Sequence, residues 1–279
     1  MEIWGRSHAR LDAALADLAG LGPIGARAVD VVDDIEVGAA VSDFLAEHGR
    51  VDILFNNAGG PDPTLALADL STDAWRGCIA ANLDSTFYCC RAVIPAMRTS
   101  GSGRIINTGS MAGKEGKAFQ SGYSAAKAWV RPDQGAGQGG ITVNAIVPTL
   151  FETPLALDAI AEAPVVFEAI RAKIRMNRLD QPEEAVALVA WIALDECSLT
   201  TGFAFDLSGG QPNDGRMHAG AKDHRHTGRA GTNESAAALV APRGRLDRSR
   251  PYRRQASGAS PTPISISSGT TGRIPATCS

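Results

Sequence analysis

The sequence predicts an α/β protein with a doubly wound parallel sheet, and three observations support that fold class. Short apolar runs alternate with longer amphipathic segments of helical spacing from residue 7 to residue 210. Asn, Gly or Ser ends several apolar runs, as in "DILFNNAG" and "RIINTGS", which is typical of buried parallel strands. Such alternation places helices on both faces of one sheet, and ligands then bind beyond the carboxyl ends of the strands.

The first elements follow this alternation. We expect a helix over residues 7–20, because Ser7 can cap its first turn and a Gly follows its last apolar residue. A short strand over 25–32, an amphipathic helix over 34–49 and a buried strand over 51–59 come next.

The remaining elements continue the pattern. Residues 71–100 keep apolar side chains at spacings of three and four, which predicts one long helix. After it we expect strands over 104–110 and 141–148, a helical segment over 154–176, a helix over 181–196 and a last strand over 203–210.

Composition divides the chain into two parts. Residues 1–210 carry 16 Lys and Arg against 26 Asp and Glu, whereas residues 211–279 carry 11 against 4. The second part includes only six Leu, Ile, Val or Phe, too few to bury a core. We therefore predict one domain over residues 1–210 and a disordered basic tail over residues 211–279.

Cysteine usage and hydropathy bear on location and partners. The five cysteines form no CxxC pair, and no metal site is predicted, since "DHRH" at residues 223–226 is typical of a solvated run. Without a leader or an apolar run of membrane length, we expect a cytoplasmic protein with reduced thiols. The tail's arginines are scattered, so nucleic-acid binding is the weaker alternative for it.

The clearest chemical signal is the pair Tyr123 and Lys127. Residues four apart lie on one face of a helix, so the ammonium can act on the phenol. A neighbouring cation favours phenolate, which makes tyrosine a usable proton acceptor near neutral pH. Chance alone also produces this spacing in some sequences of this composition.

Three further groups are expected at the same edge of the sheet. Ser110 follows a buried strand, "NNAG" at residues 56–59 follows another, and Asn82 interrupts an apolar helix. Each by itself is typical of a turn or a solvated helix face. Together they indicate a site at the carboxyl ends of the strands.

The motifs "NNAG", "ANLDSTF", "IINTGSMAG", "YSAAK", "ITVNAIVP" and "FDLSGG", in this order and spacing, resemble the short-chain dehydrogenase/reductase family. Within that family, the sequence resembles two groups about equally, namely the 3-oxoacyl carrier-protein reductases and the sugar or sugar-acid dehydrogenases. The resemblance covers roughly residues 2–210. It implies a Rossmann-like fold and an NAD(P)-dependent oxidoreductase that interconverts a secondary alcohol and a ketone.

The resemblance also implies residue roles. Tyr123 would be the general acid/base, and Lys127 would hold the nicotinamide ribose and lower the pKa of Tyr123. Ser110 would position the substrate carbonyl, and Asn82 would order a proton-relay water. The helical segment over 154–176 would cover the substrate. Family members are homo-oligomers, usually tetramers or else dimers.

Cofactor contacts are implied at further positions. Asp30 would lie near the adenine ring, and Thr153 would touch the nicotinamide amide. Arg6 stands where dinucleotide preference is set, and an arginine there suits the 2′-phosphate of NADP, with NAD as the alternative. The backbone beside the flat ligand would come from Asn57, Ala58 and Gly59.

The sequence departs from the family at its start. Nothing in it corresponds to the first strand and its glycine-rich, phosphate-binding turn. We expect a truncated chain, explained by a translation start assigned too late, whose sheet exposes an apolar edge on each side of the missing strand.

Two later departures concern "RPDQGAGQGG" at residues 131–140 and the tail. Pro132 and the glycines around it interrupt the helix that "YSAAKAWV" begins. A functional loop is one interpretation, and a frame shift near Val130, restored before Ile141, is the other. Read-through in a shifted frame would also produce the tail. The alternative to an active enzyme is therefore a catalytically impaired relative without turnover.

Overall fold

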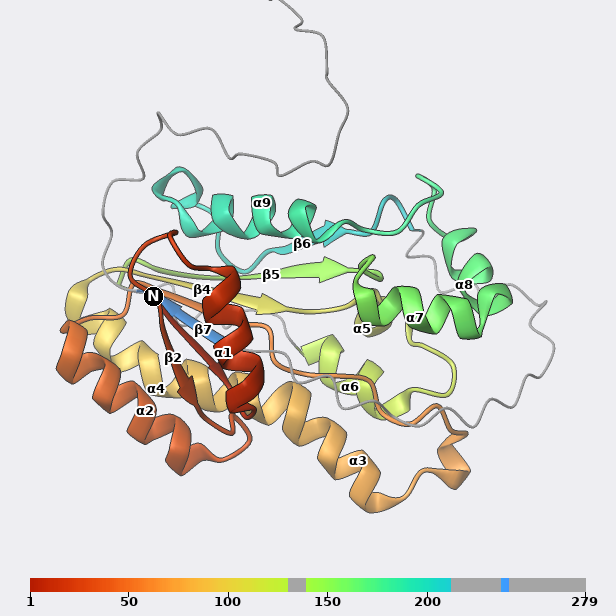
Figure 1. The fold of residues 1–279 in the computed structure, drawn as a ribbon, viewed down its shortest axis with the longest axis horizontal. Helices are drawn as coiled ribbons and strands as arrows, with labels where there is room; N and C mark the ends of the chain where they lie inside the picture. Colours follow the sequence, from red (N-terminus) through yellow and green to blue (C-terminus); the bar gives the residue numbers. More distant parts are fainter. Residues whose placement is uncertain (130–138, 212–236, 241–279) are drawn as a thin grey trace, which may run out of the picture. The chain divides into compact units, whose positions relative to one another are not determined.

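The computed structural model describes residues 1–129, 139–211 and 237–240 (Figure 1). One sheet runs through the described part of the chain. Its strands are β1 (Glu2–Gly5), β2 (Gly25–Ala28), β3 (Ile53–Asn56), β4 (Gly103–Thr108), β5 (Ile141–Pro148), β6 (Ala204–Leu207) and β7 (Ala237–Val240). The α-helices are α1 (His8–Asp17), α2 (Asp34–His48), α3 (Thr72–Ile79), α4 (Ser85–Ser100), α5 (Met111–Glu115), α6 (Ser121–Trp129), α7 (Pro154–Glu162), α8 (Pro164–Arg171) and α9 (Pro182–Ala193).

The strand order is β2-β1-β7-β3-β4-β5-β6, and the sheet is parallel except at β7. This confirms the doubly wound α/β fold. Because the parallel strands share one direction, their carboxyl ends meet along one edge of the sheet. That edge carries the residues after β1, β3, β4 and β5.

Strand β7 fills the position between β1 and β3. It pairs antiparallel with both, with Ala237 opposite Trp4 and Ala238 opposite Phe55. The sequence predicts exposed edges on β1 and β3, and the structure instead satisfies them with a segment from residues 211–279. Residues 237–240 of the predicted tail form this strand, because the N–H and C=O groups that β1 and β3 leave unpaired can hydrogen-bond with an extended segment. The tail residues 212–236 and 241–279, with the "DHRH" run, lie outside the described residues.

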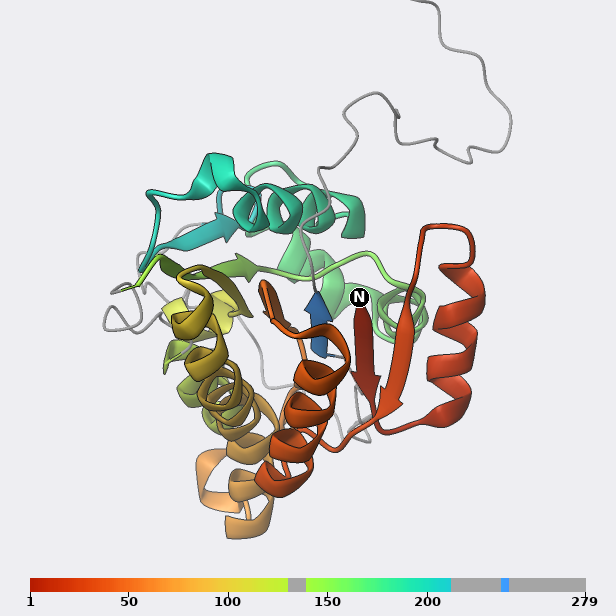
Figure 2. The same cartoon turned by 90° about the vertical axis from the view of Figure 1, so that its left-hand side faces the viewer.

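Two apolar clusters cover the two faces of the sheet. On one face, side chains of α2 and α4 such as Phe44 and Met97 pack against Leu54 and Ile105 of the strands. On the other face, Ile192 of α9 packs with strand residues including Ile106. Figures 1 and 2 show α9 on the side of the sheet opposite α2 and α4. The layers thus hold the strand ends in fixed relative positions, which a site needs.

Local signals explain several element boundaries. Ser7 caps α1 by accepting a hydrogen bond from the amide of Arg10, as predicted. Asp33 caps α2, and Gly49 ends it with φ of 75°, a conformation that favours glycine. Helix α9 begins with Pro182 and a capping box between Gln181 and Glu184.

The predicted long helix over residues 71–100 is divided by a π-helical turn over Ala80–Asp84. The sequence predicts α-helix there, and the wider turn is a structural finding. Short helix α5 was also not predicted. The helical segment over 154–176 is confirmed as α7 and α8. Residues 130–138, which hold most of the "RPDQGAGQGG" interruption, lie outside the described residues, so the frame shift stays a hypothesis.

No helix in the described ranges is both long enough and apolar enough to cross a membrane.

Candidate active site

Ser110 lies just beyond the carboxyl end of β4. The amide of neighbouring Gly109 donates to the carbonyl of Ile146 in β5 at 2.8 Å, which continues the sheet pairing up to the site. Ser110 then caps α5, its Oγ accepting from the amide of Ala112 at 3.2 Å. The side chain is largely buried. Strand β4 and helix α5 therefore fix the Ser110 hydroxyl on both sides.

Tyr123 reaches the same place from α6. Its phenol lies near enough to the side chain of Ser110 for that hydroxyl to act on the pKa of the phenol, so the structure brings these two predicted residues together. Burial of the phenol is the largest cause that raises its pKa above the usual value, and the Ser110 hydroxyl acts in the opposite direction. The nearby Asp62 also raises this pKa.

The net pKa of Tyr123 differs from the expectation of a lowered value. The pKa is raised, since loss of hydration disfavours the phenolate more than the neighbouring groups stabilise it. Lys127 lies beside the phenol ring, with 5.8 Å between Nζ and the ring centroid. The phenol is thus held in its neutral, proton-donating form.

Lys127 is itself almost fully buried. Its Nζ donates a hydrogen bond to the carbonyl of Thr108, at the end of β4, at 2.9 Å. Loss of hydration lowers the pKa of Lys127 to about 8. An ammonium at this position is costly to the fold, which is typical of residues kept for chemistry.

A glycine contact sets the distance between α5 and α6. A Cβ on Gly113 would lie 2.4 Å from the carbonyl carbon of Lys127 and 2.5 Å from its oxygen. Any side chain there would push the two helices apart. Gly113 thereby keeps Ser110, at the start of α5, in reach of Tyr123.

Asn82 lies in the π-helical turn and is fully buried. Its Nδ2 donates to the carbonyl oxygens of Gly60 and Cys78, at 2.8 and 2.9 Å, and its Oδ1 accepts from the amide of Gly60 at 3.1 Å. Single π-turns of this kind often occur at functional sites. In this structure the Asn82 amide fastens the loop after β3 to the helix.

The "NNAG" turn begins at Asn56 and continues past the end of β3. Asn57 accepts a hydrogen bond from the Thr108 hydroxyl at 3.0 Å, so the turn is tied to β4. Gly59 has φ of +143°, and a Cβ on it would lie 2.4 Å from Asn82 Oδ1 and 3.3 Å from Lys127 Nζ. Only glycine fits there, and backbone consequently lies beside Lys127.

Two predicted cofactor residues meet at the far end of this edge. Arg6 follows β1 and Asp30 lies shortly after β2, with 4.0 Å between a guanidinium nitrogen and a carboxylate oxygen. Both side chains are well exposed to solvent. Thr153 lies apart from them, before α7, where its Oγ1 accepts from the amide of Ala156 at 3.2 Å.

The residues present fit the nicotinamide half of a dinucleotide better than its phosphates. Gly59 and Lys127 leave backbone and an ammonium next to Tyr123, as a flat ring and a ribose need. At the position between β1 and β3, the described residues provide antiparallel β7 rather than a parallel strand followed by a helix. Helix amides that could bind a pyrophosphate are therefore not supplied there by the described part of the chain.

Sequence reasoning missed two groups near Tyr123. Asp62 accepts a hydrogen bond from the amide of Gly122 at 3.0 Å. Cys78 packs next to Gly122, since a Cβ on that glycine would lie 3.5 Å from Cys78 Cβ. Burial raises the pKa of the Cys78 thiol to about 11, so it stays protonated. Neither had a local signal, because Asp62 follows Pro61 in what reads as an ordinary turn.

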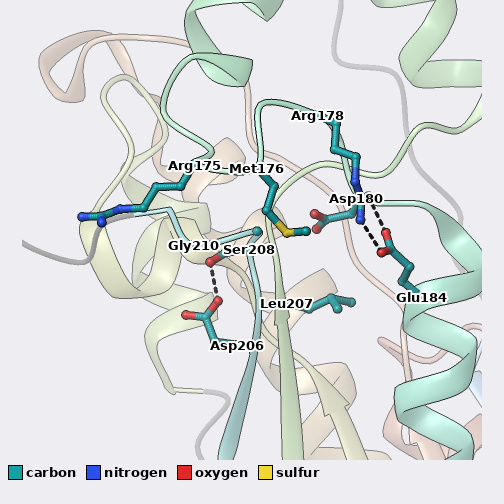
Figure 3. Close-up of a pocket in the computed structure, with 10 residues that line it drawn as sticks. Arg175, Met176, Arg178, Asp180, Glu184, Asp206, Leu207, Ser208 and Gly210 are labelled. Carbon is teal, nitrogen blue, oxygen red and sulfur yellow. Dashed lines mark hydrogen bonds and ion pairs between the residues drawn. The ribbon is translucent and has the colours of Figure 1, made fainter.

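A cavity of about 530 Å³ lies at the carboxyl end of β6 (Figure 3). Arg178 faces Glu184 there, with 2.6 Å between the paired nitrogen and oxygen. None of the four predicted catalytic residues lines it. Asp206, which does, pairs with Lys114 of α5 at 2.8 Å, so one ion pair connects the cavity wall to the helix that Ser110 caps. The lining residues are Arg175, Met176, Arg178, Asp180, Glu184, Asp206, Leu207, Ser208, Gly209 and Gly210.

Three acidic or histidine side chains gather at a different place. Glu2, Glu47 and His48 each offer a ligand atom within 4.8 Å of the others. The Glu2 carboxylate already accepts hydrogen bonds from Trp4 and Arg27. The cluster is thus explained by packing around β1.

Comparison with known proteins agrees with this geometry. The family model described as enoyl-(acyl carrier protein) reductase matches residues 4–212. The chain is 42% identical over 190 residues to 2-dehydro-3-deoxy-L-rhamnonate dehydrogenase (NAD(+)) of Sphingomonas sp., which covers 66% of this chain and 75% of the relative. It is 35% identical over 189 residues to 3-oxoacyl-acyl-carrier-protein reductase of Salmonella typhimurium, which covers 65% of this chain and 75% of that protein.

A solved structure gives the same result. A crystal structure of an actinorhodin polyketide ketoreductase variant with NADPH superposes with a TM-score of 0.68 at 30% identity, covering 75% of this chain and 86% of that one. A family match of this length, together with relatives above 30% identity over three quarters of their sequence, establishes that the chain belongs to the short-chain dehydrogenase/reductase family of oxidoreductases.

Proposed function

We propose that the protein is an NAD(P)-dependent oxidoreductase that interconverts a secondary alcohol and a ketone. The observation that carries the proposal is the contact of Tyr123 with Ser110, with Lys127 buried beside them. This arrangement provides a proton donor, a hydroxyl that can hold the same oxygen, and a cation. Those are the groups that carbonyl reduction needs besides a hydride donor.

Tyr123 and Ser110 have distinct tasks in the reducing direction. The neutral phenol donates its proton to the carbonyl oxygen of the substrate as negative charge develops there. The Ser110 hydroxyl, fixed by α5, hydrogen-bonds the same oxygen and orients the carbonyl. The bound nicotinamide supplies the hydride to the carbonyl carbon, or accepts it in the reverse direction.

The raised pKa of Tyr123 keeps the phenol in the protonated form that reduction uses. Oxidation of an alcohol requires the phenolate to accept a proton, and burial disfavours that form. The Lys127 ammonium stabilises negative charge on the phenolate as the proton leaves. Asn82, whose amide holds the Gly60 backbone, keeps the loop after β3 against this group, and a water ordered there would complete a proton path.

The cofactor would lie along the carboxyl edge from β4 to β2. Lys127 and Tyr123 would contact the nicotinamide ribose, and Thr153 the nicotinamide amide. Asp30 would lie near the adenine. NADP is our first choice because the Arg6 guanidinium suits a 2′-phosphate, with NAD as the alternative. Contacts to the flat rings would come from the turn of Asn57, Ala58 and Gly59.

The substrate is a small molecule that carries a secondary alcohol or a ketone. One relative is named for a sugar-acid substrate and another for a 3-oxoacyl carrier-protein substrate, and both names describe a ketone or the alcohol formed from it. Helices α7 and α8 would cover the substrate. We also propose a homo-oligomer, a tetramer or a dimer, and a cytoplasmic location.

A second candidate function is suggested by β7. Because an antiparallel strand fills the position between β1 and β3, phosphate binding is the weakest part of the proposed site. A catalytically impaired relative, folded but without turnover, would show that weakness as a loss of cofactor binding.

Two measurements separate these candidates. Purified protein is titrated with NADPH while nicotinamide fluorescence is followed, and turnover is then measured with a panel of ketones. We expect a fluorescence change, and NADPH consumption that Tyr123→Phe abolishes whereas the control Tyr88→Phe retains it. Absence of any fluorescence change at millimolar NADPH would instead support the impaired relative.

A further inference from the structure

Asp62 has a buried carboxylate beside the catalytic helix. It lies in the loop after β3 and is 4% exposed. Its Oδ2 accepts a hydrogen bond from the amide of Gly122 at 3.0 Å. Gly122 directly precedes Tyr123, so this bond acts on the backbone that carries the catalytic phenol.

The contact between Asp62 and Gly122 is closely packed on several sides. A Cβ on Gly122 would lie 3.1 Å from Asp62 Oδ2 and 3.5 Å from both Cys78 Cβ and Trp75 Cε3. Side chains from α3 and the loop after β3 thus close around the start of α6. A second bond joins the same two segments, since the amide of Leu65 donates to the carbonyl of Phe119 at 3.0 Å.

The other carboxylate oxygen is left without a partner. Asp62 Oδ1 has no hydrogen bond among the described residues, and neither has Oε1 of Gln120, two residues before Gly122. A buried, half-satisfied carboxylate is costly unless it has a role. The packing of the start of α6 alone needs only an uncharged acceptor at this position.

Asp62 also acts electrostatically on Tyr123, the residue next to the hydrogen bond between Gly122 and Asp62. It raises the pKa of Tyr123 and of the Cys78 thiol, and it favours the charged form of Lys117. The other groups around the phenol are Ser110 from α5, Lys127 from α6 and Cys78 from α3. Asp62 adds a carboxylic acid to this set.

We propose that Asp62 is a positioning residue for Tyr123: its Oδ2, by accepting the hydrogen bond from the Gly122 amide, fixes the start of α6 so that the phenol meets Ser110. The proposal rests on the proposed role of Tyr123 as proton donor. It adds an acid from the loop after β3 to that site, acting through the Gly122 backbone and through space. Asp62 itself touches no reacting atom.

Two variants separate the hydrogen bond from the charge. Asp62→Asn keeps an oxygen that can accept from Gly122 but removes the charge, whereas Asp62→Ala removes both. We expect Asp62→Asn to ionise Tyr123 at a pH lower by about half a unit, as loss of one nearby negative charge requires. Asp62→Ala should in addition lose about tenfold in kcat, and Asp62→Asn should recover most of that loss.

The titration is read by ultraviolet difference spectroscopy of the full chain. The protein has three tyrosines, so the difference from Tyr123→Phe isolates the signal of Tyr123. Asp52→Asn is the matched control, since Asp52 is equally buried and also has one oxygen without a partner, but lies before the amino end of β3. We expect no change of the Tyr123 titration in that control.

The outcomes are distinguishable from failure of the proposed function. A shifted phenol titration in Asp62→Asn without any turnover would keep the positioning role and reject the activity. An unshifted titration, or Asp62→Ala with wild-type kcat, would overturn the positioning role whatever the activity.

A measurement on the wild-type chain serves if both variants fold poorly. The Gly122 amide proton, which donates to Asp62 Oδ2, should exchange slowly. Fast exchange of that amide would overturn the proposal.

Discussion

Burial of the Lys127 ammonium should make this residue a cost to stability that can be measured. Lys127 is 7% exposed, and loss of hydration lowers its pKa from 10.5 to about 8. At about 1.4 kcal/mol for each pH unit, the folded protein spends roughly 3 kcal/mol to keep this group charged at neutral pH. Lys127→Met removes the charge and retains most of the volume.

The variant also loses a hydrogen bond. Met cannot donate to the Thr108 carbonyl, which Lys127 Nζ contacts at 2.9 Å, and such a loss costs about 1 kcal/mol. The expected net effect at about pH 7 is therefore a free energy of unfolding that is higher by roughly 2 kcal/mol in Lys127→Met. Turnover should be lost in the same variant.

The pH dependence provides the sharper test. Between pH values of about 8 and 10.5, the unfolded wild-type chain keeps the Lys127 proton that the folded chain has lost. Wild-type stability consequently rises with pH in this window, and the variant has no such contribution. The advantage of Lys127→Met should shrink steadily above a pH of about 8.

Urea unfolding followed by circular dichroism measures both free energies. Lys173→Met is the control, because Lys173 is exposed. Its replacement should change the free energy of unfolding by less than about 0.5 kcal/mol, both at neutral pH and in the alkaline window. The reasoning is refuted if Lys127→Met is less stable than the wild type at neutral pH and the difference does not depend on pH.

Three further predictions concern other parts of the fold. Gly113→Ala should lower the free energy of unfolding by about 2 kcal/mol and reduce turnover, because its Cβ would meet the Lys127 backbone at 2.4 Å. The control Gly38→Ala in α2, where a Cβ would meet nothing within 4 Å, should instead raise the free energy of unfolding by about 0.5 kcal/mol. Equal effects of the two substitutions in urea unfolding would contradict the contact between Gly113 and Lys127. Ala238→Pro should lower stability by about 3 kcal/mol, since it disrupts β7 between its two partners, and unchanged urea unfolding would show that β7 does not hold β1 to β3. Arg6→Gln should reduce the ratio of kcat/KM for NADPH to that for NADH about tenfold, whereas an unchanged ratio would remove Arg6 from cofactor selection.

The parts of the fold that the sequence predicted are those set by local chemistry. Ser7 caps α1 because its hydroxyl reaches an amide three residues on, and such a pattern is visible in the chain itself. The period of the apolar residues likewise gave α2 and α9. The spacing of Tyr123 and Lys127 placed both on α6, and Ser110 at the end of β4 meets them there.

The parts that the sequence did not predict depend on residues distant in the chain. The π-turn at Asn82 exists with an amide bonded to Gly60, 22 residues away, and no helical period encodes that contact. The bond from Gly122 to Asp62 joins residues 60 apart. Strand β7 likewise depends on residues distant in the chain, because its four apolar residues form a strand only where β1 and β3 leave a position between them. The pKa of Tyr123 was mispredicted because spacing shows the neighbouring cation but not the burial of the phenol.

The central claim is that Tyr123 and its neighbours support hydride transfer to a ketone. The most direct measurement incubates the protein with NADPH that carries deuterium at the transferable position of nicotinamide C4, together with a panel of ketones that includes keto acids. Mass spectrometry then follows the alcohol formed. The account predicts deuterium on the carbinol carbon with the wild-type chain and none with Tyr123→Phe. An unlabelled alcohol, or equal labelling by both proteins, would contradict it.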